Sequence, residues 1–144
     1  MKTRWSYKDK ANWSAIDKAY SLCDSGKSQL PINIEVSGCN VLLEENVLGT
    51  IYNNENFLVY DTGNVLVFRP LGNIDKVIYR GDVYWLTEIS FHTPSEHSIN
   101  REYYPMEMQM VHQNIDGHYL IIGIFFEIGD ESNIIGDAFE LGEK

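Results

Sequence analysis

The sequence predicts a mainly β protein organised on a large, mostly antiparallel sheet with few short helices. From residue 32 onward, short runs rich in Val, Ile, Tyr and Phe recur at close spacing. Turn-forming residues separate these runs, as in Asn53-Asn54, Arg80-Gly81-Asp82 and Asn114-Ile115-Asp116-Gly117. Strand-like runs joined by such short turns are typical of antiparallel sheets. The sequence contains no repeat and no linker, so we expect residues 1–144 to form a single domain.

The expected elements can be placed in chain order. The first 30 residues are rich in turn formers, and Asn12 is a good N-cap for one short helical segment. Residues 46–60 are expected to form a hairpin-like element, because the turn signal Asn53-Asn54 divides them. Further strands are expected at residues 64–68, 77–79, 83–92, 104–112 and 119–128.

The strand that ends at residue 92 leads into the stretch around which the chain is organised, Thr87 to His97. Successive side chains of a strand point to opposite faces. One face should therefore carry Glu88, Ser90 and His92, and the other face Thr87, Ile89 and Phe91. Taken alone, a histidine on a half-buried strand is usually a hydrogen-bonded structural residue.

Methionines alternate along the expected strand 104–112. Met106, Met108 and Met110 are expected to mark one buried face, because methionine fills irregular gaps in a core. His112 lies on the face opposite Gln109, and we expect it to be structural. His118 follows a turn and is expected to be solvated.

The formal net charge of −10 disfavours nucleic acids and anionic membranes as partners, because both attract clustered Lys and Arg. The N-terminal residues Met1 to Trp5 contain no apolar run typical of a signal peptide, and no segment is apolar enough to span a membrane. We therefore expect a cytoplasmic protein.

Two further features support no separate function. Cys23 and Cys39 are too few for a disulfide framework or a metal knuckle, and we expect two buried thiols of undetermined redox state. Gly26-Lys27-Ser28 matches part of a phosphate-binding loop, but the first glycine of that pattern and the following helix are missing.

Three separate motifs, in the right order, carry a resemblance to a known family. They are Trp5-Ser6-Tyr7 followed by Trp13, the stretch Ser25 to Ile34, and Phe91-His92-Thr93-Pro94-Ser95-Glu96-His97. The sequence resembles the α-class carbonic anhydrases, with Leu30 as a mild departure. The resemblance covers nearly all of this chain but only the N-terminal part of the family domain, a little over half.

The resemblance implies a large twisted central sheet of mixed direction, C-terminally truncated, with few short helices. It also implies a zinc-dependent carbonate dehydratase, a lyase in which zinc-bound hydroxide attacks carbon dioxide to give bicarbonate. Family members of bacterial type are often periplasmic or secreted. The C-terminal part, with a threonine that bonds the zinc hydroxide, has no counterpart here.

The resemblance maps three zinc-ligand positions onto this chain. His92 matches one ligand, while Ser90 and Gln109 stand at the other two. A serine hydroxyl is neutral and too short to replace an imidazole, and a glutamine offers only a neutral amide oxygen. We therefore expect that zinc, the family cofactor, is not bound stoichiometrically.

The resemblance also maps the surrounding residues. Glu88 and Glu107 match residues that orient the ligands, and His97 matches a buried structural histidine. Glu96 matches the partner of the missing threonine. Asn56 stands at the proton-shuttle position, where an amide cannot replace a histidine. The family's apolar wall for carbon dioxide corresponds to Val111 and Ile121.

Two classes of function follow. The first is a carbonic anhydrase-like protein that is catalytically inactive, a pseudoenzyme. The second is an active carbonate dehydratase whose site is completed by another chain or by ligands outside these motifs. Glu88 and Glu107 could alternatively form a weak site for a harder metal, or simply be solvated. An open sheet edge would favour self-association or a complementary polypeptide.

Overall fold

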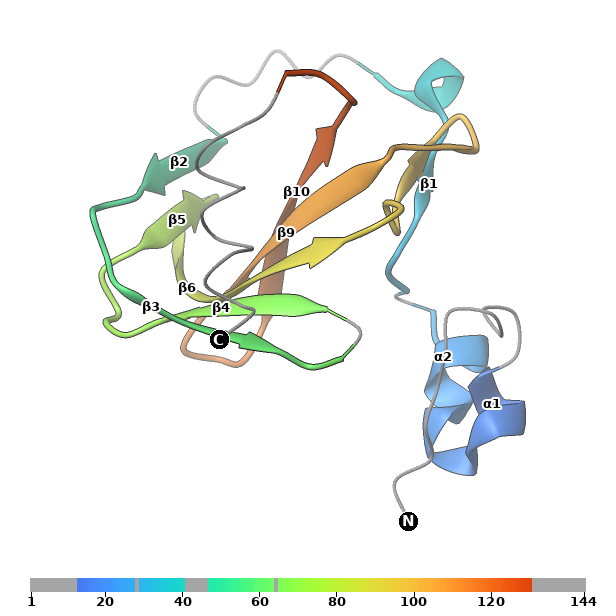
Figure 1. Ribbon diagram of the computed structural model, residues 1–144, viewed down its shortest axis with the longest axis horizontal. Coiled ribbons are helices and arrows are strands. Elements are labelled where there is room, and N and C mark those ends of the chain that lie inside the picture. Colours follow the sequence, from blue (N-terminus) through green and yellow to red (C-terminus); the bar gives the residue numbers. More distant parts are fainter. Residues whose placement is uncertain (1–12, 28, 41–46, 64, 131–144) are drawn as a thin grey trace. The chain divides into compact units, whose positions relative to one another are not determined.

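The computed structural model describes residues 13–27, 29–40, 47–63 and 65–130, and it confirms the mainly β prediction. Figure 1 shows a large, strongly twisted sheet with short helices near the N-terminus. The chain divides into two compact units, Met1–Ile32 and Asn33–Lys144. Each unit is described by itself.

The first unit holds three short helical segments where we expected one after Asn12. They are α1 (Trp13–Ile16), the 3-10 helix η2 (Lys18–Tyr20) and α2 (Ser21–Ser25). Asp17 caps the second segment, since its side chain accepts a hydrogen bond from the Ala19 amide at 2.9 Å. Asp24 accepts from the Ser14 amide at 2.8 Å, which ties α2 to α1.

The second unit contains every strand in the described part of the chain. Its larger sheet has seven strands, five of them in the order β10-β9-β6-β4-β3, and β5 joins β6 to β2. Their bounds are β2 (Leu48–Ile51), β3 (Phe57–Asp61), β4 (Leu66–Pro70), β5 (Lys76–Tyr79), β6 (Asp82–His92), β9 (Met106–Gln113) and β10 (Tyr119–Phe126).

A smaller sheet lies in the same unit. It consists of β1 (Asn33–Ile34), β7 (Ser98–Ile99) and β8 (Glu102–Tyr103), and the 3-10 helix η3 (Val36–Gly38) follows β1. The β1–β7 pair is parallel, whereas every strand pair recorded in the larger sheet is antiparallel. The direction is therefore mixed for the unit, as the resemblance implied, but antiparallel for the large sheet.

The expected hairpin over residues 46–60 does not form. β2 pairs with β5 and β3 pairs with β4, so the two halves of this segment bond to different partners. The segment between them is held elsewhere, because the Asn53 amide donates to a carboxylate oxygen of Asp75 at 2.7 Å. Partners outside the segment therefore override the local turn signal.

β6 is the strand on which the large sheet depends. It pairs along one side with β9 and along the other side with β4 and β5. The register with β9 shifts between Leu86 and Glu88, so Thr87 is the extra residue of a β-bulge. The prediction that Thr87 simply alternates with Ile89 and Phe91 is therefore wrong, because the bulge interrupts the alternation.

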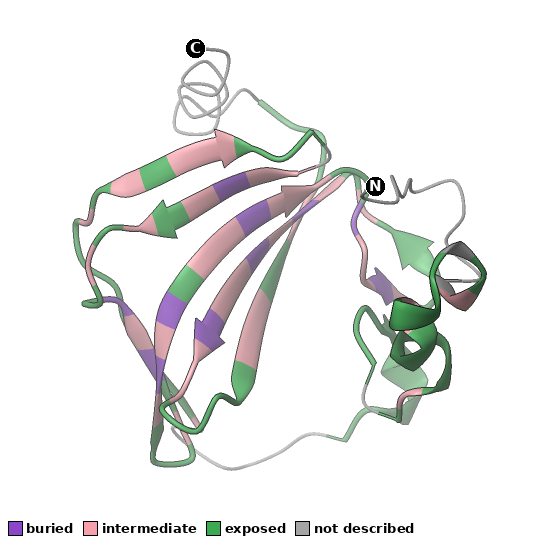
Figure 2. Ribbon diagram, turned by 90° about the horizontal axis from the view of Figure 1, so that it is seen from below, coloured by how far each residue is buried: buried purple, intermediate pink, exposed green. Residues whose placement is uncertain are grey.

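Buried positions follow the middle of the large sheet, as the purple segments in Figure 2 show. The buried apolar residues of the described part are Val67, Val77, Tyr84 and Leu86. On β9 the buried residues are Glu107, Gln109 and His112, while the methionines at 106, 108 and 110 are only half-buried. The expected methionine face is therefore only partly buried, and His112 is its fully buried residue on β9.

Two other expectations concern exposure. Cys23 and Cys39 are both exposed free thiols, so the expectation of two buried thiols is wrong. His118 is exposed, as expected for a turn exit. Among the described residues, no helix has the length and apolar character needed to cross a membrane.

Candidate functional site

The pairing of β6 with β9 brings the predicted site residues onto one face of the sheet. Ser90 lies opposite Gln109, and His92 lies opposite Glu107. Glu88 lies opposite Val111 on the same face. Residues two apart on a strand share a face, so the register gathers all three metal-ligand positions in one place. We call this the polar face.

Ser90 and His92 are joined directly. The Ser90 hydroxyl lies 3.0 Å from His92 Nε2. On the other side of the ring, His92 Nδ1 lies 3.5 Å from a carboxylate oxygen of Glu96. A carboxylate at Nδ1 favours the tautomer with its proton on that nitrogen, so Nε2 is left to accept from the hydroxyl.

The turn after β6 places Glu96 over Gln109. The Gln109 side-chain amide donates to the second carboxylate oxygen of Glu96 at 3.1 Å. The turn itself is fixed by Ser95, whose hydroxyl donates to the His97 carbonyl at 2.7 Å and accepts from the Tyr104 amide at 2.9 Å. Two hydrogen bonds and the His92–Glu96 ion pair therefore connect Ser90, His92, Glu96 and Gln109 in one row.

Glu107 is fully buried, and all of its recorded bonds go to the same turn. One carboxylate oxygen accepts from the amides of Glu96 at 2.9 Å and His97 at 3.0 Å. The other lies 2.6 Å from His97 Nδ1. Glu107 therefore anchors the turn that carries Glu96, and it orients His97.

Glu88 is engaged at the opposite end of the polar face. Its carboxylate accepts from the Arg69 guanidinium at 3.1 and 3.2 Å, and Arg69 also stacks over the Tyr60 ring at 5.2 Å. This ion pair lines an open pocket of about 460 Å³, together with Thr87, Val111, Gln113 and Tyr119. Glu88 is therefore paired with an arginine that the sequence motifs did not indicate.

Three of the expected site residues remain to be placed: Val111 and Ile121 lie on β9 and β10, and Asn56 lies in the loop before β3. Val111 and Ile121 pair across β9 and β10, and both are half-buried. Asn56 is exposed in the loop before β3, where its carbonyl accepts from the Leu71 amide at 2.9 Å. Sequence reasoning missed Gly123, where a Cβ atom would lie only 2.8 Å from a carboxylate oxygen of Glu107.

A second buried polar group lies on the other face of β9. His112 is fully buried, with Nε2 at 3.0 Å from the Tyr52 hydroxyl and Nδ1 at 3.3 Å from the Leu120 carbonyl. Burial lowers the pKa of the His112 imidazole, and burial together with the negative Asp75 raises the pKa of Tyr52. These shifts favour a neutral tyrosine–histidine pair, which supports the expectation that His112 is structural.

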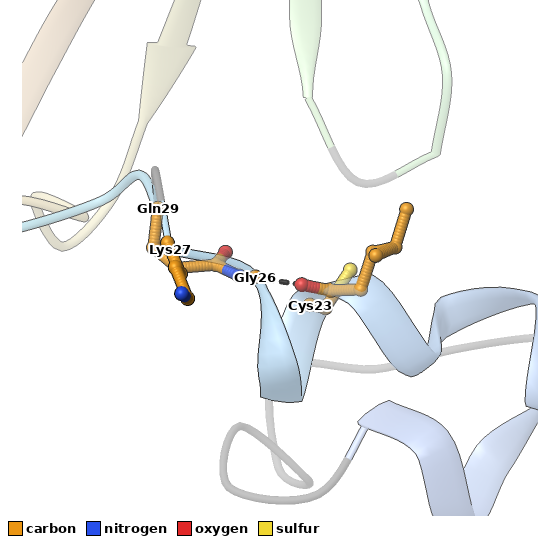
Figure 3. A pocket seen from close by; sticks show the side chains of 5 residues that line it. Cys23, Gly26, Lys27 and Gln29 are labelled. Atoms are coloured by element: carbon orange, nitrogen blue, oxygen red, sulfur yellow. Dashed lines mark hydrogen bonds between the residues drawn. The ribbon is translucent and has the colours of Figure 1, made fainter.

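The first unit contains a separate open pocket of about 440 Å³, lined by Leu22, Cys23, Gly26, Lys27 and Gln29 (Figure 3). The Gln29 side-chain amide donates to the Leu22 carbonyl at 2.5 Å, drawn as a dashed line in Figure 3. Gln29 therefore bonds back to α2.

The donor set on the polar face does not fit a catalytic zinc ion. Catalytic zinc sites use imidazole, thiolate or carboxylate donors, whereas two of the three positions here hold a neutral hydroxyl and a neutral amide. The Nε2 atom of the single imidazole already accepts from Ser90. Within the described ranges, no three His, Cys, Asp or Glu side chains converge as a metal-binding group.

The fold and the site together define a mainly β protein whose twisted antiparallel sheet carries a cluster of polar side chains on the neighbouring strands β6 and β9. A family model described as eukaryotic-type carbonic anhydrase matches residues 8–138. The chain therefore belongs to the carbonic anhydrase family, as the sequence motifs indicated.

Known proteins agree with this assignment. Alpha carbonic anhydrase 3 of Arabidopsis thaliana is 27% identical over 128 residues, which cover 88% of this chain and 46% of that protein. A carbonic anhydrase of Klebsiella pneumoniae is 28% identical over 134 residues, which cover 90% and 53%. A hyperthermostable carbonic anhydrase from a hydrothermal vent chimney superposes with a TM-score of 0.82 at 28% identity, covering 95% of this chain and 61% of that one. The chain thus spans about half the length of these curated relatives.

Proposed function

We propose that this chain is a carbonic anhydrase-like protein that neither holds stoichiometric zinc nor hydrates carbon dioxide. The observation that carries the proposal is the row of polar contacts that connects Ser90, His92, Glu96 and Gln109 on the polar face. Ser90 occupies His92 Nε2, and Gln109 is bonded to Glu96. A metal ion at this place would have to break these bonds and accept two weak neutral donors in return.

The residues expected to orient zinc ligands support the same proposal. Glu107 bonds to His97 and the turn, and Glu88 bonds to Arg69. Zinc sites depend on such outer partners, and losing one typically costs about 10–100-fold in metal affinity.

The test is metal content and turnover of the purified chain. After dialysis against a weak chelator, elemental analysis should find well under one zinc per chain, and carbon dioxide hydration should equal the uncatalysed rate. One tightly held zinc per chain, or hydration above background, would contradict the proposal.

A rescue variant tests the geometry behind it. Ser90→His with Gln109→His adds two imidazoles beside His92, which makes three on the polar face, and should give measurable zinc affinity. The matched control is Ser90→Ala with Gln109→Ala, which opens the same hydrogen bonds without adding a ligand. If the histidine pair binds zinc no better than the alanine pair, the three positions do not converge as the strand register implies.

The alternative is a carbonate dehydratase whose site is completed by a second polypeptide. It predicts zinc and activity in a complex purified with its native partner, and neither in the isolated chain.

A further inference from the structure

We propose that the outer edge of β10 pairs with β10 of a second copy of this chain, in antiparallel direction and about a two-fold axis. β10 lies at one end of the larger sheet, and among the described strands it pairs only with β9. The new pairing would join the larger sheets of two copies into one continuous sheet. It does not rest on the proposed lack of carbonic anhydrase activity, because it depends only on the backbone and composition of β10.

The loop between β9 and β10 fixes which backbone groups of β10 face outward. The Asn114 amide donates to the His118 carbonyl at 3.0 Å, and the Gly117 amide donates to the Asn114 carbonyl at 3.1 Å. Asn114 is therefore a hydrogen-bonded position of the ladder, and such positions alternate along an antiparallel pair. The even-numbered residues of β10 thus bond to β9. The residues whose amides and carbonyls point away from β9 are Tyr119, Ile121, Gly123 and Phe125.

β10 has none of the features that protect an exposed edge. Natural edge strands are short, or they carry charged side chains, prolines or bulges. The eight residues of β10 include no charged residue and no proline, and their register with β9 is continuous. The strands at the other ends of the larger sheet are shorter: β2 has four residues, and β3 has five and ends at Asp61. The composition of β10 is therefore that of a strand with a partner on both edges.

A second copy fits this edge because β10 is complementary to itself. With Ile122 opposite the partner's Ile122, outward-facing residues meet only outward-facing residues. Tyr119 then lies opposite the partner's Phe125, and Ile121 lies opposite the partner's Gly123. Residues paired in this way exchange both of their hydrogen bonds, so every outward amide and carbonyl of β10 is satisfied. No like charges meet along the joint, because the strand is uncharged.

The side chains of β10 favour the same register. Gly123 is exposed, and the partner's Ile121 would cover it, as large side chains do for glycines on edge strands. On the other face, Ile124 is 41% exposed and would meet the partner's Leu120. The two copies of Ile122 would form a pair without hydrogen bonds, the type in which side chains approach most closely.

The pairing would also change the polar face. Gly123 lies opposite Gln109, so the odd-numbered residues of β10 belong to that face. Paired residues on neighbouring strands point to the same side of a sheet. The partner's Ile121 would therefore lie beside Gly123 and add an apolar wall to the polar face. The polar faces of the two copies would lie on one side of the continuous sheet.

The charge of the chain predicts how salt affects the pairing. Each copy carries a formal net charge of −10, which opposes association. Such repulsion is screened beyond about 8 Å at physiological ionic strength. The joint itself contains no ion pair, so salt should weaken the repulsion without weakening the contact. We expect the dimer fraction to rise with salt concentration.

The first experiment tests the register by disulfide cross-linking of the full chain. Cys23→Ser and Cys39→Ser remove the exposed thiols, and Ile122→Cys is added to this parent. Facing residues of a pair without hydrogen bonds have Cα atoms about 4.5 Å apart, which a disulfide can bridge. Mild oxidation should therefore give a covalent dimer. The matched control is Ile124→Cys, whose two copies would lie four positions apart along the strands, about 13 Å, which is too far.

The second experiment tests the edge itself by sedimentation at micromolar concentration and several salt concentrations. Ile121→Pro removes an outward amide and leaves the ladder to β9 intact, since a proline is tolerated where its nitrogen faces outward from an edge strand. The parent and Ile121→Val should be dimers, and Ile121→Pro a monomer. Near-ultraviolet circular dichroism checks that each variant is folded, and the cross-linking result stands even if the proline variant does not fold.

Three results would each overturn the pairing. A parent that is monomeric at every salt concentration would show that β10 does not take up a second copy. Cross-linking at Ile122→Cys no faster than at Ile124→Cys, or a dimer of folded Ile121→Pro, would place the contact elsewhere. Failure of the proposed function would show separately, because zinc content and carbon dioxide hydration enter none of these measurements.

Discussion

Replacing the buried carboxylate of Glu107 by an amide should destabilise the fold strongly. Glu107→Gln keeps the size of the side chain but removes the charge from three hydrogen bonds, to the Glu96 amide, the His97 amide and His97 Nδ1. Hydrogen bonds to a charged group are worth about 1.5–3 kcal/mol each, against about 0.5–1.5 kcal/mol for neutral ones. The difference, about 1 kcal/mol per bond, gives an expected loss of about 2–4 kcal/mol.

Chemical denaturation measures this loss, and the matched control is the same substitution at Glu88. Glu88 also bonds to a cationic side chain, but that pair is largely solvated, with Arg69 59% and Glu88 30% exposed. Surface ion pairs typically contribute about 0–1 kcal/mol, so Glu88→Gln should cost less than about 1 kcal/mol. If Glu107→Gln costs no more than Glu88→Gln, the buried carboxylate does not hold the turn as described.

Three other predictions concern the sheet. Gly123→Ala would place a Cβ atom 2.8 Å from a carboxylate oxygen of Glu107 and should lower the free energy of unfolding by about 1–3 kcal/mol. The control is Gly49→Ala, whose Cβ atom would lie 3.8 Å from its nearest neighbour, on Ile78; it should leave the stability unchanged or raise it slightly. Burial lowers the pKa of His112, so the unfolded chain binds a proton at a higher pH than the folded chain does. The free energy of unfolding should therefore fall as the pH drops below about 6.5. The fall should be shallower in His112→Gln, and equal slopes in the parent and the variant would contradict the linkage to His112. We also propose that the chain self-associates or takes up a complementary polypeptide, because β10 pairs only with β9 among the described strands; sedimentation showing a sharp monomer at micromolar concentration would be the opposing result.

Local turns made part of the fold predictable from the sequence. The β5–β6 and β9–β10 hairpins were expected because Arg80-Gly81 and Gly117 lie between strand-like runs, and all three residues adopt positive φ. The pairing of β2 with β5 joins residues far apart in the chain, with Leu48 opposite Tyr79. No local signal specifies such a pairing, and the segment 46–60 was therefore misassigned as a hairpin.

The candidate site also has features that local sequence patterns predict and features that depend on long-range pairing. Strand alternation correctly placed Glu88, Ser90 and His92 on one face, because that periodicity is intrinsic to a strand. The bond from Gln109 to Glu96 depends on how the turn folds back over β9, which alternation does not specify. The Arg69–Glu88 pair depends on the register between β4 and β6, and only the three-dimensional pairing reveals it.

The bulge at Thr87 acts as a change of phase within one strand. Before it, Leu86 lies opposite the buried His112; after it, Glu88 lies opposite Val111, on the other face. The same even-numbered positions therefore serve the apolar side of the sheet in the first half of β6 and the polar face in the second half. Without this single residue the ladder would run without interruption, and Leu86 could stay opposite His112 while Ser90 stays opposite Gln109. Because of this one inserted residue, a substitution at an even-numbered position before Thr87 affects packing against His112, and one at an even-numbered position after Thr87 affects the polar face.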